Sequence, residues 1–422
     1  MKIIYLHQYF NTPEMSGGTR SYEMARRMVT AGHEVHMITS IRESSDHSND
    51  WRLTEEAGIQ VHWYPVPYSN YMTYRQRLKA FFSFARAAQK KAMQLDGDVV
   101  FATSTPLTIA LPAVRAARFK NIPMVFEVRD LWPELPIAMG ALKNPFLRIV
   151  ARLLERWAYK NAQSVVALSP GMKDGVVKAG YPASKVAVIP NSSDNRDFLY
   201  NKEDVDCFRN SRDWLGNRPL LVYTGTFGKI NGVDYLVRLA KELLILGSET
   251  RILLLGDGAE RAAVKDLALK EGVYQNNLFI ENPLPKKDIP VVLGAATMAS
   301  VLFIDLPQMR PNSANKFFDS LASGTPVLLN FGGWMHELVN AHGCGLSLWN
   351  KPIKEVALEI DEKMRDGDWL LESGKSARAL AEAKFDRDLL ASQLMSVLHH
   401  TVAGSPQKAA EIAPGNYSVK GD

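Results

Sequence analysis

Long apolar runs are missing from the 422-residue sequence. A membrane-spanning helix needs about 20 consecutive apolar residues, and the mean hydropathy is only -0.14, so no spanning helix is expected. Cysteine is also scarce, because the chain has only Cys207 and Cys344, which cannot form a disulfide framework or a zinc site. After Met1 and Lys2, the apolar stretch at residues 3–6 is shorter than the core of a secretory signal. We therefore expect a protein of the cytoplasm.

A strong excess of one charge is missing too. The 50 basic and 45 acidic residues give a formal net charge of +5, which is too small for a dedicated nucleic-acid binder, so no nucleic acid partner is expected. His7, His33, His36 and His62 are scattered without the spacing of metal ligands. Neither glycine-rich loop described below carries a D-x-D pair. We therefore expect no metal and no cofactor.

What is present is a regular alternation of strand-like apolar runs and helical patterns. A first set precedes a polar stretch and comprises residues 3–6, 34–38, 59–63, 99–102, 124–127, 164–167 and 186–189. A second set comprises residues 220–223, 251–255, 278–280, 298–303 and 327–329. Alternating strands and helices form parallel sheets with helices on both faces. The sequence thus predicts an α/β protein of two doubly wound, Rossmann-like domains facing across a cleft.

The two sets define the expected domain boundaries. We assign residues 1–190 to the first domain, 191–218 to a linker and 219–384 to the second domain. A helix over about residues 385–400 follows, and the tail at 403–422, rich in small and polar residues, is expected to be disordered. Ligands of open α/β sheets bind beyond the carboxyl ends of the strands, so the active site is expected in the cleft.

A loop with paired glycines follows the first predicted strand. Gly17 and Gly18 come shortly before a helix predicted over residues 21–31. Backbone N–H groups at a helix start, together with the helix dipole, favour an anion such as a diphosphate. The alternative is a flexible loop, and the spacing is not that of the GxGxxG dinucleotide fingerprint.

The second domain opens in the same way. Gly225 and Gly228 follow its first strand, and Lys229 comes directly after them. Glycines and a lysine at a helix start suit phosphate oxygens, and the missing GK[ST] ending excludes a Walker loop. The alternative for Lys229 is a solvated turn residue.

Two further clusters carry candidate polar side chains. A short helix would place Lys316 and Asp319 about one turn apart, where the cation could bind phosphate and the carboxylate a ribose diol; a surface ion pair is the alternative. A second cluster lies at the end of the strand at 124–127. It comprises Glu127, Arg129, Asp130, Trp132 and Glu134. Carboxylates at that position can accept a proton or bind sugar hydroxyls, whereas a structural pair of Arg129 with Asp130 is equally compatible.

In their order and spacing these pieces resemble the bacterial glycosyltransferases of family four, in particular the surface-polysaccharide branch that includes fucosamine transferases. The resemblance covers about residues 1–400, and each motif alone is weak. The motifs are SGG at 16–18, RDLWPE at 129–134, ALSPGM at 167–172, IPN at 189–191, TGTFGKINGVDYL at 224–236, LLGDG at 254–258 and KFFDSLASGTPVL at 316–328.

The resemblance implies the GT-B fold and transfer with retention of configuration. The acceptor would bind the first domain and a nucleotide sugar, expected to be a UDP donor, the second; the terminal helix would return to the first domain. Gly17 and Gly18 would bring backbone donors to the diphosphate, and Lys229 and Lys316 would neutralise it as it leaves.

The nucleotide would lie against two loops of the second domain. One is the loop at 281–284, with Asn282 and Leu284, and the other is the loop at 256–258, with Gly256 and Asp257. The resemblance adds further substrate-binding candidates to these four. They are Arg129, Glu134, Gly225, Gly228, Asn315 and Asp319.

The sequence departs from the family pattern on the donor side. The usual pair of glutamates eight residues apart falls at Pro311 and Asp319. Asp319 can still hold a ribose diol, but Pro311 offers no side-chain hydrogen bond to the donor sugar, so an N-acetylated or 6-deoxy amino sugar is expected. The usual arginine and lysine align with Thr226 and Asn231, which leaves Lys229 as the cation.

On the acceptor side, the histidine that often precedes the aspartate is Arg129 here. Asp130 is then the candidate that positions the acceptor or accepts its proton.

Two segments indicate contact with an anionic membrane surface. Residues 57–95 contain no acidic residue. They carry Arg75, Arg77, Lys79, Arg86, Lys90 and Lys91 among Tyr71, Tyr74, Phe81, Phe82 and Phe84. In residues 146–160 an apolar and a basic set recur at helical spacing. The sets are Phe146, Ile149, Val150, Leu153, Leu154 and Trp157, and Arg148, Arg152, Arg156 and Lys160.

The second pattern is typical of a helix that lies on an anionic bilayer; a helix packed on its own domain, with a solvated basic stripe, is the alternative. A polyprenyl-diphosphate-linked saccharide would be the natural acceptor at such a surface. The leading hypothesis is therefore sugar transfer in O-antigen, capsule or exopolysaccharide biosynthesis.

Three other functions remain as alternatives. They are a UDP-sugar 2-epimerase on the same fold, a non-catalytic glycan-assembly partner, suggested by Pro311, and an NAD-dependent dehydrogenase. The last lacks the glycine fingerprint that its first loop requires.

Overall fold

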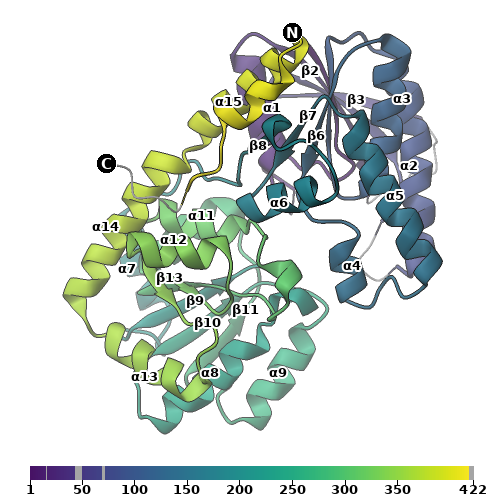
Figure 1. Ribbon diagram of the computed structural model, residues 1–422. Coiled ribbons are helices and arrows are strands. Elements are labelled where there is room, and N and C mark those ends of the chain that lie inside the picture. Colours follow the sequence, from purple (N-terminus) through teal and green to yellow (C-terminus); the bar gives the residue numbers. More distant parts are fainter. Residues whose placement is uncertain (16, 43–49, 69–71, 418–422) are drawn as a thin grey trace. The chain divides into compact units, whose positions relative to one another are not determined.

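The computed structural model describes residues 1–15, 17–42, 50–68 and 72–417, which form two compact units. Unit 1 comprises Met1–Pro190 and Asp388–Asn416, and unit 2 comprises Asn191–Arg387 and Tyr417–Asp422. Each unit contains one sheet with helices on both faces (Figure 1). The predicted α/β class with two doubly wound domains is confirmed.

Unit 1 is built on an eight-stranded sheet in the order β3-β4-β2-β1-β5-β6-β7-β8. Its strands are β1 Lys2–Leu6, β2 Glu34–Ile41, β3 Arg52–Glu56, β4 Ile59–Pro65, β5 Val99–Thr103, β6 Met124–Val128, β7 Ser164–Ala167 and β8 Val186–Val188. Helices connect them, namely α1 Arg20–Thr30, α2 Tyr74–Gln94, α3 Ala110–Lys120, α4 Glu134–Ala138, α5 Pro145–Asn161 and α6 Pro170–Lys178. The chain reverses its winding direction between β1 and β5, so the loops after these two strands diverge and leave a crevice.

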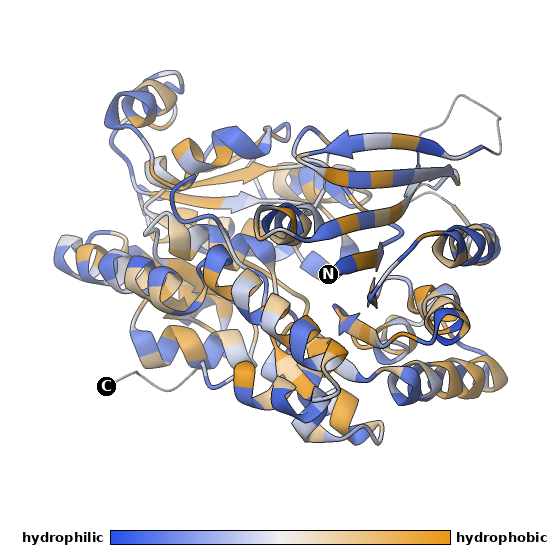
Figure 2. Ribbon diagram, turned by 90° about the horizontal axis from the view of Figure 1, so that it is seen from above, coloured by the Kyte–Doolittle hydropathy of each residue, from blue (hydrophilic) through white to orange (hydrophobic). Residues whose placement is uncertain are grey.

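The central strand β1 separates two apolar cores, because successive side chains of a strand point to opposite faces. Ile4 and Leu6 pack in the core that includes buried residues of α2, α3 and α5. Ile3 and Tyr5 pack in the other core, with α1 and α15 Arg387–Val402. The helices alternate hydrophilic and hydrophobic segments along their length, as covering one face of a sheet requires (Figure 2).

Strand β3 is absent from the prediction and runs antiparallel to β4. Its sequence, RLTEE, is polar and mostly exposed or half-exposed, so no apolar run marks it. The turn between the strands places Ala57 and Gly58 at φ 50° and 79°, the left-handed region that two-residue hairpins use.

The C-terminal tail corrects the expectation of disorder over residues 403–416. The segment forms a 3-10 turn at Pro406–Lys408 and α16 Ala409–Ile412. Ala409 and Ala413 are buried in the core that contains α1 and α15, and the amide of Val188 donates to the carbonyl of Ala413 at 2.8 Å. Ile412 packs against the same core, and Ser164 and Lys173 donate to the carbonyls of Pro406 and Pro414. Residues 418–422 lie outside the described part of the chain.

Unit 2 has a six-stranded parallel sheet in the order β11-β10-β9-β12-β13-β14. Its strands are β9 Leu220–Thr224, β10 Arg251–Leu255, β11 Leu278–Glu281, β12 Met298–Val301, β13 Val327–Leu329 and β14 Gly345–Ser347. The last, of three residues, is absent from the prediction. The winding reverses between β9 and β12, so the crevice of this unit lies beyond those strands.

Helices cover both faces of this sheet (Figure 1). They are α7 Lys202–Asn210, α8 Asp234–Ile245, α9 Arg261–Lys270, α10 Ile289–Ala295, α11 Asn315–Ala322, α12 Trp334–His342, α13 Ile353–Lys363 and α14 Gly367–Lys384. The predicted linker at 191–218 is corrected, because it belongs to unit 2 and contains α7. Within the described ranges, no helix is both long and apolar enough to cross a membrane.

Candidate active site

The candidate donor-side residues of unit 2 are grouped around Lys316, near the start of α11. Its Nζ donates to the hydroxyl of Tyr223 at 3.0 Å and lies 4.1 Å from the centroid of that ring. Tyr223 in turn donates to the carbonyl of Thr226 at 2.8 Å. Burial lowers the pKa of Lys316 to about 7, although the charge of Asp319 opposes the shift. An ammonium held this way is ready to gain charge stabilisation from an anion.

Close contacts and positive φ angles restrict two positions around Lys316 to glycine. A Cβ at Gly225, where φ is +146°, would lie 2.8 Å from the Lys316 Nζ. A Cβ at Gly256 would lie 1.8 Å from the carbonyl oxygen of Gly225. The loops are joined by backbone hydrogen bonds of 2.9 Å from Gly225 to Leu255 and from Phe227 to Asp257. Side-chain-free backbone thus surrounds the lysine.

The other cation of the prediction, Lys229, has a different setting. It begins a 3-10 turn, Lys229–Asn231, after Gly228, and its side chain is exposed. It makes no hydrogen bond or ion pair with any residue that the structure describes. A solvated lysine on this loop can reach a ligand without breaking an existing contact.

Asp319 is not paired with Lys316, although both lie on α11. Its Oδ1 accepts a short hydrogen bond from Ser193, and its Oδ2 forms an ion pair with Lys286 Nζ at 2.7 Å. The expected ribose contact therefore has to share this carboxylate with two protein partners. Lys286 is half exposed and could yield its place.

The remaining donor-side candidates lie at the surface. Asp257, Asn282, Leu284 and Asn315 are all exposed, and Asn282 accepts a hydrogen bond from Arg261 at 3.0 Å. The preceding Glu281 is fixed by Arg212, which donates to both of its oxygens at 3.0 and 2.7 Å. This bidentate pair sets the position from which the loop at 281–284 begins.

The candidate acceptor-side residues of unit 1 centre on Asp130, which follows β6. Thr105 donates to Asp130 Oδ2 at 3.0 Å, and no described residue bonds its Oδ1. Burial raises the pKa of the Asp130 carboxyl, while Arg129 and Thr105 act in the opposite direction. Asp130 therefore has a free oxygen and a raised proton affinity.

Arg129 is oriented by two contacts. Its backbone amide donates to Ser104 at 2.9 Å, and its Nη1 lies 3.3 Å from Nε2 of His7. Because a guanidinium can only donate, that nitrogen of His7 is the acceptor and its proton sits on Nδ1. Burial lowers the pKa of His7 far below its usual value, with Arg129 and Arg42 adding to the effect, so the ring is neutral.

Glu127 is a structural residue rather than a base. It is fully buried, with Oε1 2.9 Å from Arg20 Nη2, and accepts a further hydrogen bond from Thr103. Arg20, the first residue of α1, also donates to the carbonyls of Ile189 and Pro190. This buried ion pair fixes the start of α1 to the ends of β6 and β8.

The glycine loop of unit 1 lies just before α1. Gly17 is exposed at φ +132°, and a Cβ there would lie 2.7 Å from Asn11 Nδ2. Asn11 Nδ2 also donates to the carbonyl of Gly18 at 3.3 Å. Thr19 provides no side-chain cap for the helix, so an anion could take that role. Ser16 lies outside the described residues.

Glu134 does not join the Asp130 group. It begins α4 and forms an ion pair with Arg152 of α5, at 3.1 Å. Sequence reasoning missed Tyr223, Lys286 and Gln8. The Gln8 amide is buried, and neither its oxygen nor its nitrogen has a hydrogen-bond partner in the described chain; a polar residue directly after a buried strand was the signal available.

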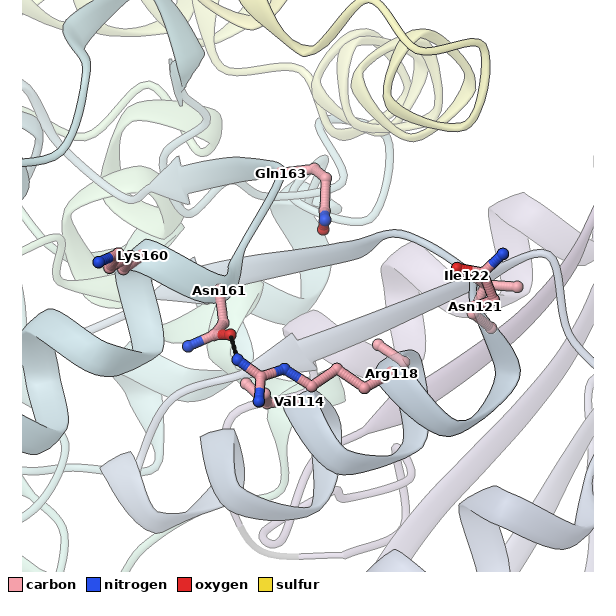
Figure 3. Close-up of a pocket in the computed structure, with 8 residues that line it drawn as sticks. Val114, Arg118, Asn121, Ile122, Lys160, Asn161 and Gln163 are labelled. Atoms are coloured by element: carbon pink, nitrogen blue, oxygen red, sulfur yellow. Dashed lines mark hydrogen bonds between the residues drawn. The ribbon is translucent and has the colours of Figure 1, made fainter.

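An open pocket of about 330 Å³ in unit 1 is not part of this site. Arg118, Asn161 and Gln163 line it, and Arg118 donates to Asn161 (Figure 3). It lies where β6 and β7 begin, at the opposite edge from Asp130. Among the described residues no group of three or more histidine, cysteine, aspartate or glutamate side chains is placed to hold a metal ion.

Two family models match the chain in succession. Residues 17–192 match the Glycosyl transferase 4-like domain, and residues 204–385 match the Glycosyl transferases group 1 domain. The chain belongs to the GT-B glycosyltransferases. In this glycosyltransferase the first match contains Asp130 and the second contains Lys316.

Similar proteins include two bacterial ones. The glycosyltransferase is 24% identical over 307 residues to a protein of Escherichia coli K12 assigned as the colanic acid biosynthesis glycosyl transferase WcaI, covering 67% of this chain and 72% of that one. It is 26% identical over 311 residues to a protein of Pseudomonas aeruginosa assigned as glycosyltransferase WbjE, covering 71% and 74%. The name of the first relative places that protein in colanic acid biosynthesis.

Solved structures share the fold. The sucrose-phosphate synthase of Thermosynechococcus elongatus aligns with a TM-score of 0.77 at 17% identity, covering 96% of this chain and all of that one. Anabaena HepE in complex with UDP and glucose aligns with a TM-score of 0.69 at 16% identity, covering 94% and 99%. At this identity the likeness concerns the GT-B fold alone.

Proposed function

We propose that the glycosyltransferase moves a sugar from a UDP donor to a lipid-linked glycan, with retention of configuration and without a metal ion. The observation that carries the proposal is the ammonium of Lys316, enclosed over Tyr223 beside the bare backbone of Gly225. Such a cation has a lowered pKa and stabilises a leaving diphosphate better than a solvated one. Lys229, exposed on the neighbouring loop, adds a second positive charge.

In the proposed reaction, the bond from the anomeric carbon to the diphosphate oxygen breaks, and UDP leaves with the bonding electron pair. The acceptor hydroxyl oxygen bonds to the same carbon from the face that UDP leaves. Its proton passes to the free Oδ1 of Asp130, whose raised pKa suits this task. Lys316 and Lys229 take up the charge that builds on the diphosphate.

The donor sugar is proposed to be an N-acetylated or 6-deoxy amino sugar, because Pro311 replaces a hydrogen-bonding side chain at the position that the family uses. The nucleotide is proposed to bind the loops at 256–258 and 281–284, with its ribose at Asp319. The process is proposed to be surface polysaccharide assembly, in line with the names of the relatives.

The acceptor is proposed to be a polyprenyl-diphosphate-linked saccharide that the protein meets at the inner face of an anionic membrane. Apolar residues of α5 support this, since Phe146, Ile149 and Leu153 are 69%, 56% and 58% exposed. Arg152, Arg156 and Lys160 of the same helix are exposed too, while Ala158 and Tyr159 pack inward. An apolar face flanked by cations fits the boundary of an anionic bilayer.

Helix α2 contributes less apolar surface to the proposed membrane contact than its sequence predicts. Phe81 and Phe84 are buried and only Phe82 of that set is shown to be exposed, at 53%. Tyr71 and the side chain of Tyr74 lie outside the described part. The basic residues Arg75, Arg86 and Lys90 remain exposed, so α2 would add charge rather than insertion.

Thermal unfolding with UDP, GDP, ADP or dTDP at matched concentrations, with EDTA present, tests the donor site. A ligand at about 100 times its Kd stabilises the folded state by about 2.7 kcal/mol. Of the four nucleotides, only UDP should raise the Tm. Turnover of UDP-sugars with a prenyl-diphosphate saccharide should be unaffected by EDTA. No shift with any nucleotide would overturn the proposal, and donor conversion without acceptor would indicate an epimerase.

A further inference from the structure

Four side chains gather at the carboxyl ends of β1, β2 and β4, and we call them the Tyr9 cluster: Tyr9, Arg42, Tyr68 and Arg77. The rings of Tyr9 and Tyr68 lie 4.9 Å apart between centroids. The guanidinium carbon of Arg77, on α2, lies 5.8 Å from the centroid of Tyr68. The backbone amide of Tyr68 donates to the carbonyl of Arg42 at 3.4 Å, which fixes Tyr68 beside Arg42.

The electrostatics of the cluster are those of a site for an anion. Burial raises the pKa of the Tyr9 hydroxyl and the neighbouring Tyr68 adds to the rise, while the positive charges of Arg42 and Arg77 act in the opposite direction. Arg42 donates to the neutral Asn11, and no described carboxylate forms an ion pair with it. Tyr68 and Arg77 of the cluster belong to the stretch 57–95, which lacks acidic residues. Tyr9 and Arg42 precede that stretch.

The position of the cluster links it to the acceptor half of the site. Asn11, which receives the hydrogen bond from Arg42, also holds Gly18 through its Nδ2. Arg42 follows β2 and Asp130 follows β6, and these strands run in the same direction in one sheet, so both residues lie at the same sheet edge. An anion at the cluster would therefore lie at the sheet edge that carries the proposed proton acceptor.

We propose that the Tyr9 cluster binds the diphosphate of the lipid-linked acceptor, an inference that rests on the proposed function and names its acceptor subsite. Arg42 and Arg77 present planar guanidinium groups that bind phosphate oxygens in a bidentate manner. Tyr68 provides an aromatic face beside them. The diphosphate is held by these groups, and the saccharide that it carries extends toward Asp130.

The test measures binding of farnesyl diphosphate, a soluble probe of the prenyl diphosphate, by isothermal titration calorimetry to the full-length protein. Arg42→Gln and Arg77→Gln should each weaken binding at least tenfold, and Arg42→Lys should recover part of it. Arg86→Gln is the matched control, since Arg86 is an exposed arginine of the same helix, and it should bind as the wild type does.

Two further measurements separate the possible sources of the anion. UDP stabilisation should be unchanged in all four variants, which shows that they fold and that the donor half is intact. Flotation with vesicles containing phosphatidylglycerol should also be unchanged in Arg42→Gln and Arg42→Lys, because Arg42 does not belong to the basic segment of α2. Wild-type probe affinity in Arg42→Gln and Arg77→Gln would overturn the inference, as would a loss of vesicle binding by these variants with no loss of probe binding. Failure of UDP to bind the wild-type protein would count against the proposed function instead.

Discussion

Lys316 donates a hydrogen bond of 3.0 Å to the hydroxyl of Tyr223, at a point where Gly225 leaves the space beside the ammonium open. The lysine comes from the start of α11 and the tyrosine from β9, so two elements far apart in sequence together fix the position of this ammonium group. The contact keeps the ammonium away from bulk water without giving it a neighbouring counter-ion within pairing distance. Several measurable consequences follow from that arrangement.

Replacing Lys316 by methionine should abolish most turnover and leave folding intact. Loss of one preorganised charge-stabilising group costs about 10²–10³-fold in kcat, while removal of a cation from a buried position relieves its desolvation. Steady-state kinetics and a thermal melt measure the two effects. A Tm well below that of the wild type, or a kcat close to it, would contradict the role of Lys316.

Donor binding should weaken as pH rises above about 7. In the free protein Lys316 loses its proton around that pH, whereas the bound diphosphate favours the charged form and raises its pKa again. Binding above pH 7 must therefore take up a proton, so the affinity for UDP falls with increasing pH. Calorimetry of UDP binding in buffers of different ionisation enthalpy reports the uptake directly, and it should vanish in Lys316→Met.

The same lysine predicts the pH dependence of stability. Its pKa is lowered in the folded state to about 7 from its ordinary value of 10.5, so the unfolded chain binds more protons between these pH values. The contribution of Lys316 to the free energy of unfolding should therefore rise with pH across this window. Denaturant titrations of wild type and Lys316→Met at pH 7 and pH 10 should show a smaller difference at the higher pH.

Replacing Asp130 by asparagine should lower kcat by about 10²–10⁴-fold, the range for loss of a general base. UDP binding should not change, because Asp130 belongs to unit 1 and the donor half lies in unit 2. The raised pKa of Asp130 also predicts that wild-type activity declines on the acid side sooner than an ordinary aspartate would allow. A pH profile of kcat/KM checks this, and an unchanged kcat in Asp130→Asn would exclude the proton-accepting role.

The membrane role of α5 can be tested by replacing Ile149 and Leu153 together with serine. Flotation with vesicles containing phosphatidylglycerol should fall at least tenfold, because two apolar contacts with the bilayer are lost. Leu358→Ser is the matched control, since Leu358 is 57% exposed on a helix of unit 2. Equal flotation of the double variant and the control would rule out α5 as the contact surface.

The strands were predictable because each is a short, almost fully buried apolar run. The patterns at 251–255 and 327–329 match β10 and β13 at both ends, where apolar residues occupy nearly every position of a strand covered on both faces. Strand β3 was not predicted, because a strand at the edge of the sheet needs no buried apolar run. The order of the C-terminal tail was not predicted, because Ala409 and Ala413 are buried by contacts with distant residues of unit 1.

The candidate site was predictable to a smaller extent. Glycines after the first strand of each unit could be read from spacing, and a positive φ at both Gly17 and Gly225 accounts for the residue type there. The ion-pair partner of Asp319 could not be predicted from the sequence, because Lys286 reaches it from another loop, 33 positions away. The role of Tyr223 was hidden for the same reason, since its place at the end of a buried strand marks it first as core.

The position of α15 has a consequence for how the protein is made. Leu390, Leu394 and Leu398 of this helix fill the same core as Ile3 and Tyr5 of β1. During synthesis, the packing of β1 is therefore complete only after α15 has been translated. Residues 191–387 are translated in one stretch and can close their sheet earlier. Until α15 has been translated, the face of the unit 1 sheet that carries Ile3 and Tyr5 lacks part of its apolar cover.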